Sequence, residues 1–536
     1  MVLGFLRFGK KPGGDGPSNG ASPEAGPVWR EEELAGVRLA PDLEENLARL
    51  KEIVGTSYDA VFRRFRVSLL GGWPAAIVHL NLMSNAAAIQ EAVLKPLMFE
   101  STLAGRPRGR DALGVIGDYL LGVPETREVG DLGGVFSSLL AGGVILLVQG
   151  ETRALALDLR QYPQRPVGTS EIEPAVRGPR EAFTENIAMN TALIRKRLRT
   201  PNLTAESLTL GTVTRTQVVV MYVRGLVQPS LVEEVKTRLH RIRIDAVLES
   251  GYLEELVQDD PWSPFPQLGN TERPDRIAGA LLEGRVAIFT DGSPTVMWLP
   301  VRFPDLIQVG EDYYHNHYFA SAIRILRFIA FWLAIAGTSF YIAMVTYHQE
   351  MIPTRIFESI AASRESIPFP SAVEALLLEG AAEMLREAGL RIPTILGQSV
   401  SIVGTLILGQ VAVTAGLVSP QMAIVVTLGL LSSFMLPTFN TAQTIRLLRF
   451  PLMVMAALWG LFGLMAGLFL ILMHMISLRS FGASYYGPFA PFEPSEMKDT
   501  FVRAPWWAMT TRPGQIVKGN VRRQQPAWAA RPGRRP

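Results

Sequence analysis

The chain has 536 residues, enough for about three domains of ~150 residues each. Charged residues make up 19%, against about 25% in a typical soluble protein, and the mean hydropathy is +0.20. The net charge of +3 gives no bulk basic signal for nucleic acid, so we expect no nucleic-acid partner. The absence of cysteine excludes disulfides, thiol catalysis and cysteine-ligated metals.

Residues 1–43 are predicted to form a disordered leader on the cytoplasmic side. The apolar patch around Phe5 and Leu6 is too short for the core of a signal peptide, and a Gly/Pro/Ser-rich run follows it. We therefore expect a leader that is not cleaved. A weak membrane-surface anchor through Phe5, Leu6 and Phe8 is the alternative.

Residues 44–161 carry alternating helical and strand-like patterns, which predict a first small α/β unit. The expected elements are a helix over 42–66, a strand over 75–82, a helix over 86–98, and a helix, glycine break and strand over 133–150. The residues 152–159 alternate in polarity and are expected to pair with that last strand as a hairpin across Gly150-Glu151.

Residues 162–180 are rich in Pro, Gly and Arg and are predicted to link this unit to a second α/β unit over 181–305. The expected elements of the second unit are a basic amphipathic helix over 181–199, a buried strand over 216–225, helices over 229–243 and 250–258, and two strands over 284–300. These last strands flank Asp291-Gly292, a pair that favours tight hairpins. A solvated face or a subunit contact is the expected role of the basic residues 195–199.

The clearest signal is apolar, and it predicts an α-helical polytopic membrane domain over 306–495. The run 328–347 is uncharged, and 392–445 is uncharged and too long for one span. Because a hydrocarbon core takes ~20 apolar residues per helix, four spans are expected. They lie near 326–347, 395–417, 420–441 and 451–477, with an amphipathic helix over 371–390.

The basic residues after the last span, within 496–536, predict a cytoplasmic tail by the positive-inside rule. Four spans then place the N-terminus in the cytoplasm as well. Arg446 and Arg449 fall on the outer side in this scheme and count against it. A re-entrant segment near Pro437 would resolve the conflict.

Six stretches resemble the GerA family, the A-subunits of spore germinant receptors. They are "DGSPTVMWLPVRFPDLIQVGEDYY" (291–314), "HQEMIPT" (348–354), "PFPSAVEALLLEGAAEMLREAGLRIP" (368–393), "GQSVSIVGTLILGQVAVTAGLVSP" (397–420), "RLLRFPLM" (446–453) and "LRSFGASYYGPFAP" (478–491). The resemblance covers about residues 45–510. A sister branch, the spoVA-operon membrane protein, does not carry the His-Gln-Glu-Met-Ile-Pro stretch that stands here at 348–353.

The resemblance implies a place in the spore inner membrane of an endospore-forming bacterium. It also implies a transporter-like B-subunit and a lipoprotein C-subunit as partners, and a role in triggering the release of monovalent cations. The implied assembly is a homo-oligomeric ring that forms a nutrient-gated channel, for which a pentamer is a guess. The residues alone carry none of these statements.

The second span holds the best pore candidates. At 100° per residue, Gln398, Ser401 and Thr405 share one stripe with small residues further along the helix. Such a stripe lines water or, equally, lets helices pack closely. Both readings stay open.

Glu374 is a further ion-pathway candidate, because it falls among the apolar residues of the predicted amphipathic helix. Glu379, Glu383, Arg386 and Glu387 are expected on the polar face instead. The simpler role for Glu374 is a first-turn acid that the helix dipole favours. The sharper role is a carboxylate that faces a cation pathway.

The stretch His348-Gln349-Glu350 follows the first span, and Pro353 ends the helix there. No second ligand stands four residues after His348, so a zinc site of the His-Glu-x-x-His type is excluded. The stretch is expected to be a polar stop at the membrane boundary, or to place Glu350 as an acid near a pore mouth. With Arg446 and Arg449, the residues His348, Gln349 and Pro353 are also markers of the family resemblance.

We expect no enzyme and no cofactor. Neither α/β unit carries a nucleotide-binding glycine loop, and the Ser, His and Asp residues show no catalytic motif. A secondary transporter is the runner-up function, although the spans show no internal repeat. A non-conducting membrane scaffold of the receptor is the third.

Overall fold

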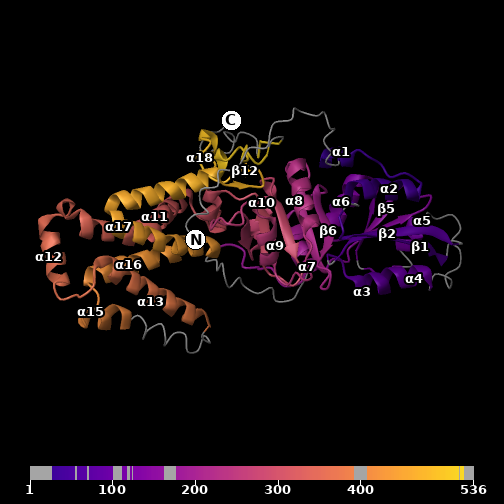
Figure 1. The fold of residues 1–536 in the computed structure, drawn as a ribbon. Coiled ribbons are helices and arrows are strands. Elements are labelled where there is room, and N and C mark those ends of the chain that lie inside the picture. Colours follow the sequence, from indigo (N-terminus) through magenta and orange to yellow (C-terminus); the bar gives the residue numbers. More distant parts are fainter. Residues whose placement is uncertain are drawn as a thin grey trace.

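The computed structural model describes residues 27–54, 57–68, 72–81, 83–99, 112–117, 121–123, 125–161, 177–391, 407–517 and 520–523. Two α/β units follow one another, and a bundle of apolar helices lies at the opposite end from the first unit (Figure 1). The fold class predicted from the sequence, α/β followed by α-helical, is confirmed.

The first unit is a five-stranded antiparallel sheet in the order β1-β2-β4-β5-β3. Its strands are β1 (Ala60–Val67), β2 (Trp73–Leu80), β3 (Thr126–Val129), β4 (Val144–Val148) and β5 (Ala154–Leu157). α2 (Leu43–Val54) and α6 (Leu132–Leu140) pack on one face, and the helical run of α3 (Ala86–Ala88), η2 (Ile89–Leu94) and α4 (Lys95–Met98) on the other, with α5 (Ala112–Val115). The predicted β4–β5 hairpin is present.

Two expectations for this end of the chain differ from the structure. The predicted helix over 42–66 stops at Val54, and residues 60–67 form β1 instead, because they pair with β2 along their whole length and bury Phe65 and Val67. Part of the predicted disordered leader is ordered: α1 (Glu31–Ala35) packs on the unit with Leu34 and Leu39 buried. Residues 1–26 lie outside the described residues.

The second unit has a sheet in the order β6-β7-β9-β10-β8. Its strands are β6 (Leu203–Leu210), β7 (Thr216–Val223), β8 (Gly269–Thr271), β9 (Val286–Thr290) and β10 (Val296–Leu299), and its helices are α7 (Ile187–Arg197), α8 (Pro229–Arg241), α9 (Ser250–Val257) and α10 (Pro274–Leu282). The β9–β10 hairpin confirms the prediction around Asp291-Gly292. α7 begins later than predicted, because the Asn186 side chain caps it.

The two units have the same topology. In each, the strands occur in the spatial order first, second, fourth, fifth, third, with every neighbouring pair antiparallel. In each, a helix precedes the first strand and another, α6 or α10, precedes the fourth. The N-terminal region is therefore a structural duplication, which the sequence patterns did not reveal.

A buried ion pair joins the units. The Arg195 guanidinium donates to both carboxylate oxygens of Asp59, at 2.7 and 2.9 Å, and also to the Leu203 carbonyl. Around it, the Tyr58 amide donates to the Ala205 carbonyl. The described part of the predicted linker, residues 177–180, also lies against Arg273 of the second unit and against Glu311 and Tyr314, which precede α11, and residues 162–176 lie outside the described residues.

The helical part contains α11 (His317–Tyr347), α12 (Thr354–Arg364), α13 (Ser371–Arg391), η8 (Ile407–Val411), α15 (Ala412–Thr414), α16 (Pro420–Phe434) and α17 (Phe439–Ser477). Among the described residues, α11 and α17 are long and apolar enough to cross a membrane, and α16 is a shorter apolar helix. The hydrophobic core is continuous from the second unit into these helices.

α17 is a helical hairpin. Gly460 has φ of 60° and ψ of −141°, which breaks the helix and reverses the chain. A Cβ at Gly467 would lie 2.5 Å from Leu452, although these residues would stand about 22 Å apart along a straight helix. Both ends of α17 therefore meet the second unit: Asn440 at Glu254 and His474 at Ser263.

This hairpin changes the predicted spans. The structure has α16 over 420–434 instead of 420–441, and α17 begins at Phe439 instead of 451. Arg446 and Arg449 lie inside its first half, near the second unit, and not in an outer loop. The predicted span 395–417 is described only from residue 407.

Residues 478–523 differ from a free basic tail wherever they are described. They run back along the second unit as a strap, which includes β11 (Arg479–Ser480), β12 (Ala483–Ser484) and α18 (Pro494–Met497). The Phe303 amide donates to the Tyr485 carbonyl, and the Arg324 guanidinium binds Asp499 at 2.8 Å. Burial raises the pKa of Asp499, although the charge of Arg324 opposes this shift.

Candidate functional site

A buried ion pair between α13 and α17 lies in the interior of the helical part. Arg449 Nη1 is 2.6 Å from Glu379 Oε2, and each side chain is 1% exposed. Thr338 of α11 donates to Glu379 Oε1 at 3.0 Å, and Arg449 Nε donates to the Ala334 carbonyl at 2.7 Å. Both charges are thus satisfied by polar groups from α11, which a buried pair requires.

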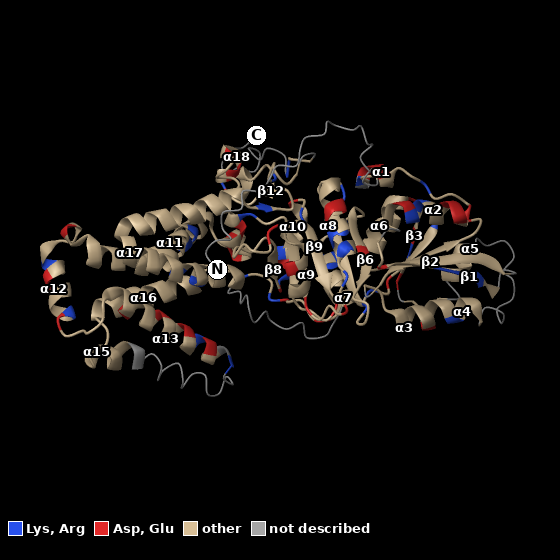
Figure 2. Cartoon of the chain, in the orientation of Figure 1, with Lys and Arg blue, Asp and Glu red and all other residues tan. Residues whose placement is uncertain are grey.

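α13 is an inverted amphipathic helix: it buries charged side chains and exposes apolar ones. Glu374 and Glu379 are fully buried against α11, α16 and α17, whereas Val373, Leu377 and Met384 are 39%, 52% and 71% exposed. The sequence predicted Glu379 on a polar outer face, and the structure directs it into the bundle. Figure 2 shows red and blue bands along α13, beside bundle helices that are mostly tan.

Glu374 lies near the far end of the bundle, where α13 begins. Its Oε1 accepts hydrogen bonds from the Ser419 amide and hydroxyl at the N-terminus of α16. That helix end favours a negative charge. The second carboxylate oxygen, Oε2, is buried and accepts no hydrogen bond from the residues that the structure describes. Within this part of the chain, Glu374 is therefore a buried carboxylate with one oxygen that lacks a donor.

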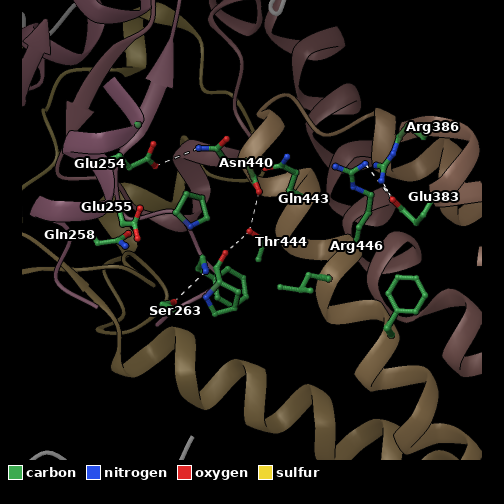
Figure 3. A pocket seen from close by; sticks show the side chains of 16 residues that line it. Glu254, Glu255, Gln258, Ser263, Glu383, Arg386, Asn440, Gln443, Thr444 and Arg446 are labelled. Carbon is green, nitrogen blue, oxygen red and sulfur yellow. Dashed lines mark hydrogen bonds and ion pairs between the residues drawn. The ribbon is translucent and has the colours of Figure 1, made fainter. Parts of the chain in front are cut away.

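At its other end the charged row opens into a cleft of about 620 Å³ between α9 and the helices α13 and α17 (Figure 3). On the helical wall, Glu383 pairs with Arg386 and lies 4.0 Å from Arg446. Figure 3 shows Glu254 and Glu255 on the opposite wall, which comes from α9. The cleft therefore has one acidic wall and one that carries two guanidinium groups.

Glu254 is a half-buried acid of this cleft. Burial raises the pKa of Glu254 above the usual glutamate value, although the hydrogen bond from Asn270 at 2.6 Å opposes the shift. Asn440 of α17 donates to its other oxygen at 3.4 Å. Glu254 thus links the second α/β unit to the start of the helical hairpin.

The stretch 348–353 lies at the distal tip of the bundle. His348 ends α11, and the Gln349 side chain donates to the Val345 carbonyl at 2.9 Å. Glu350 is exposed in a short 3-10 turn, and Pro353 precedes α12. The neighbouring Tyr347 hydroxyl donates to carbonyls of Ala457 and Leu458 at the turn of α17.

The predicted site residues thus separate into groups. Arg449 and Arg446 come together with acids of α13, Glu374 caps α16, and Glu350 lies apart at the distal tip. Gln398, Ser401 and Thr405 lie outside the described residues. The sequence analysis missed Glu379 and Thr338 as site residues, although charges of opposite sign in two apolar segments were the available signal.

The arrangement provides a chain of ionisable groups through an apolar bundle, from the cleft through Glu383 and Glu379 to Glu374. No group of three or more metal-binding side chains occurs among the described residues. Carboxylates that line such a route attract cations and bind them weakly enough for passage when water or hydroxyl groups share the coordination.

Comparison with known proteins identifies the family of this chain. The family described as Bacillus/Clostridium GerA spore germination protein matches residues 48–515. The chain belongs to the GerA family. The match covers both α/β units, the helical bundle and the strap, so the GerA assignment applies to the whole architecture described above.

Relatives of this GerA-family chain include two proteins of Bacillus subtilis (strain 168). The uncharacterized membrane protein YfkQ is 42% identical over 482 residues, which cover 90% of this chain and 93% of YfkQ. Spore germination protein KA is 38% identical over 495 residues, which cover 92% of this chain and 90% of that protein.

A solved structure is also similar. It is the crystal structure of the N-terminal domain of the A subunit of the Bacillus megaterium spore germinant receptor GerK3, with 34% identity and a TM-score of 0.40. The alignment covers 51% of this chain and 98% of that domain.

Proposed function

We propose that this GerA-family chain is a multi-pass subunit of a spore germinant receptor in the spore inner membrane. It helps trigger germination by nutrient-gated release of monovalent cations, as part of an oligomeric cation channel. Its expected partners are a transporter-like B-subunit, a lipoprotein C-subunit and further copies of itself. The relatives named as spore germination proteins support the receptor role.

The dimensions of the bundle support the membrane placement. α11 and the first half of α17 run side by side in the same direction, since Arg449 binds Ala334 and Tyr347 binds Ala457. The uncharged part of α11 from Phe328 to Tyr347 rises about 28 Å, close to the ~30 Å of a hydrocarbon core. The bundle is thus long enough to span a bilayer several times.

The observation that carries the channel proposal is the row of buried charges on the inverted helix α13. A soluble helix would expose Glu374 and Glu379 and bury Leu377 and Met384, and α13 does the opposite. In a membrane, such an arrangement costs free energy and is retained where ions or protons move. The unpartnered Oε2 of Glu374 fits a position where a passing cation replaces a hydrogen-bond donor.

The test is Glu374→Gln in the full chain. We expect the substitution to lower cation current in planar bilayers, and to weaken the preference for cations over anions, without reducing the amount of folded protein. Glu387→Gln is the matched control, because Glu387 lies on the same helix, is 60% exposed and pairs with the exposed Arg391. The control should leave current unchanged.

The same recordings separate the alternatives. Unitary current steps support a channel, and solute uptake coupled to an ion gradient supports a secondary transporter. A chain that is silent alone and with its receptor partners is a scaffold. Equal current and selectivity in the Glu374→Gln and wild-type proteins would remove Glu374 from the ion pathway.

A further inference from the structure

The loop between α9 and β8 carries the most exposed large apolar side chain on the described surface of the second unit. Trp262 is 93% exposed. Its neighbours are fixed: the Ser263 hydroxyl lies 2.8 Å from His474 Nε2, and the Pro264 carbonyl accepts from the Thr444 hydroxyl at 2.5 Å. A rigidly anchored loop therefore holds an indole ring out beside both ends of the α17 hairpin.

The register of the helices gives the level of this ring. Arg449 of α17 binds Ala334 of α11, so Thr444, five residues earlier, lies level with Ile329. Ile329 lies two residues after Arg327, near the start of the uncharged run 328–347. Trp262 is thus held where the polar base of the bundle meets its apolar surface, which is the position that tryptophan prefers in a bilayer.

The exposed face of α9 extends this apolar surface onto the second unit. Tyr252 and Leu256 stand at helical i, i+4 spacing on α9 and are 45% and 49% exposed, and Leu248, just before the helix, is 64% exposed. The adjacent polar face of α9 lines the cleft with Glu254 and Glu255. α9 therefore presents apolar side chains in one direction and carboxylates in another.

The apolar surface is also continuous with that of the bundle. Leu447 of α17, which lines the same cleft, is 63% exposed, and Met473 and Ile476 at the end of the hairpin are 52% and 44% exposed. These side chains belong to the helix whose length fits a bilayer. Trp262 lies beside these side chains, so a bilayer that covers them would also contact the indole ring. This argues for lipid as the partner of the loop.

We propose that the second α/β unit rests on the bilayer surface through Trp262 and the apolar stripe of α9, with the indole in the headgroup region. The proposal depends on the membrane placement put forward above. In this arrangement the cleft opens beside the membrane surface, and the lipid contact holds the acidic wall of the cleft against its arginine wall.

The chain has no cysteine, so a single spin label can be placed without changing the background. We would label Trp262→Cys in the full-length protein in phosphatidylcholine/phosphatidylglycerol nanodiscs and measure collision with oxygen and with a water-soluble nickel chelate. Leu256→Cys keeps the tryptophan in place as a second probe. Phe469→Cys, 60% exposed in the middle of the returning helix, reports lipid, and Val213→Cys, 78% exposed in the β6–β7 turn, reports water.

The expected result is an oxygen-to-nickel accessibility ratio at Trp262 between those of Phe469 and Val213, with Leu256 also shifted toward Phe469. A lipid-exposed Phe469 together with a water-exposed Trp262 overturns this inference and leaves the membrane placement standing. Protection of Trp262 from both reagents also overturns it, because it indicates a protein partner. A water-exposed Phe469 refutes the membrane placement itself.

Discussion

At the scale of single residues, the chain contains two buried arginine–carboxylate ion pairs in different surroundings. Arg195–Asp59 and Arg449–Glu379 are both buried ion pairs with nearly complete hydrogen bonding. The first fastens the two α/β units, beside further contacts such as those of Tyr58 with Thr191 and of Arg224 with the Ile53 carbonyl. The second lies in the helical bundle, where an apolar pair would pack as well, so its retention calls for a role beyond stability.

The Arg449–Glu379 pair gives a prediction that separates stability from conduction. Glu379→Gln leaves Arg449 as a buried cation without its counter-ion, and we expect a loss of about 3–5 kcal/mol of stability. The double variant Glu379→Leu/Arg449→Met removes both charges and should recover most of that loss. Thermal unfolding of the purified protein in detergent would measure both values.

The double variant then tests function in a folded protein. If the buried row conducts, this variant should be stable and yet pass less current than the wild type. Glu44→Gln breaks an exposed pair with Arg64 and serves as the control, with an expected change of 0–1 kcal/mol. A double variant that conducts normally would contradict the role of the pair in the ion pathway.

At the scale of elements, the sequence predicted what local patterns specify and missed what tertiary contacts decide. The β4–β5 and β9–β10 hairpins have turn residues between apolar strands and were predicted. β1 was taken for helix because its apolar spacing suits both periods over a short run, and pairing with β2 decides between them.

The candidate site was only partly predictable for the same reason. Glu374 and the two arginines stood out as ionisable groups within apolar segments. Their partners did not, because the pairing of Arg449 with Glu379 depends on how α13 and α17 dock, and these residues are 70 positions apart. The α17 hairpin was hidden as well, since one glycine in an apolar helix has no unique meaning in a sequence.

Gly460 therefore makes a prediction at the level of the element. Its backbone lies in a region that only glycine adopts readily, and an added Cβ would lie 2.9 Å from His348 Cε1 and 3.0 Å from Tyr347 Cβ. We expect Gly460→Ala to lower stability by about 1–3 kcal/mol and to open the hairpin. The loss of a short-range dipolar coupling between spin labels at Leu447 and Met473, which are 63% and 52% exposed on the two halves of the hairpin, would report the opening.

Gly337→Ala is the matched control for that experiment. Gly337 lies within α11, and a Cβ there would meet nothing within 4 Å. Alanine in a helix is favoured over glycine by roughly 0.5–1 kcal/mol, so this variant should be neutral or more stable. Equal behaviour of the two variants would mean that Gly460 does not hold the reversal.

At the scale of the whole molecule, both α/β units and the strap lie at the same end of the helical bundle. The second α/β unit contacts the start of α11, both ends of the α17 hairpin and the strap. Asp312 lies at the junction with α11 and binds Arg324 and Arg327 of that helix. Burial would raise the pKa of Asp312, but hydrogen bonds and charges from Arg327 and Arg324 hold this pKa below the usual value. The second unit therefore contacts both long helices.

This gathering predicts a topology that resolves the conflict over Arg446 and Arg449. Both α/β units, both ends of α17 and the strap lie on one side of the membrane, and only the tip around 348–353 and Gly460 lies on the other. In protoplasts that express single-cysteine variants, Met351→Cys, 63% exposed at the tip, should react with an impermeant maleimide. Val213→Cys should react only after permeabilisation, since α11 and the α17 hairpin leave their bases on the cytoplasmic side. Labelling of Val213→Cys in intact protoplasts would mean that the orientation is the reverse of the one predicted. Protection of Met351→Cys in both conditions would mean that the tip stays within the bilayer and the bundle does not cross it.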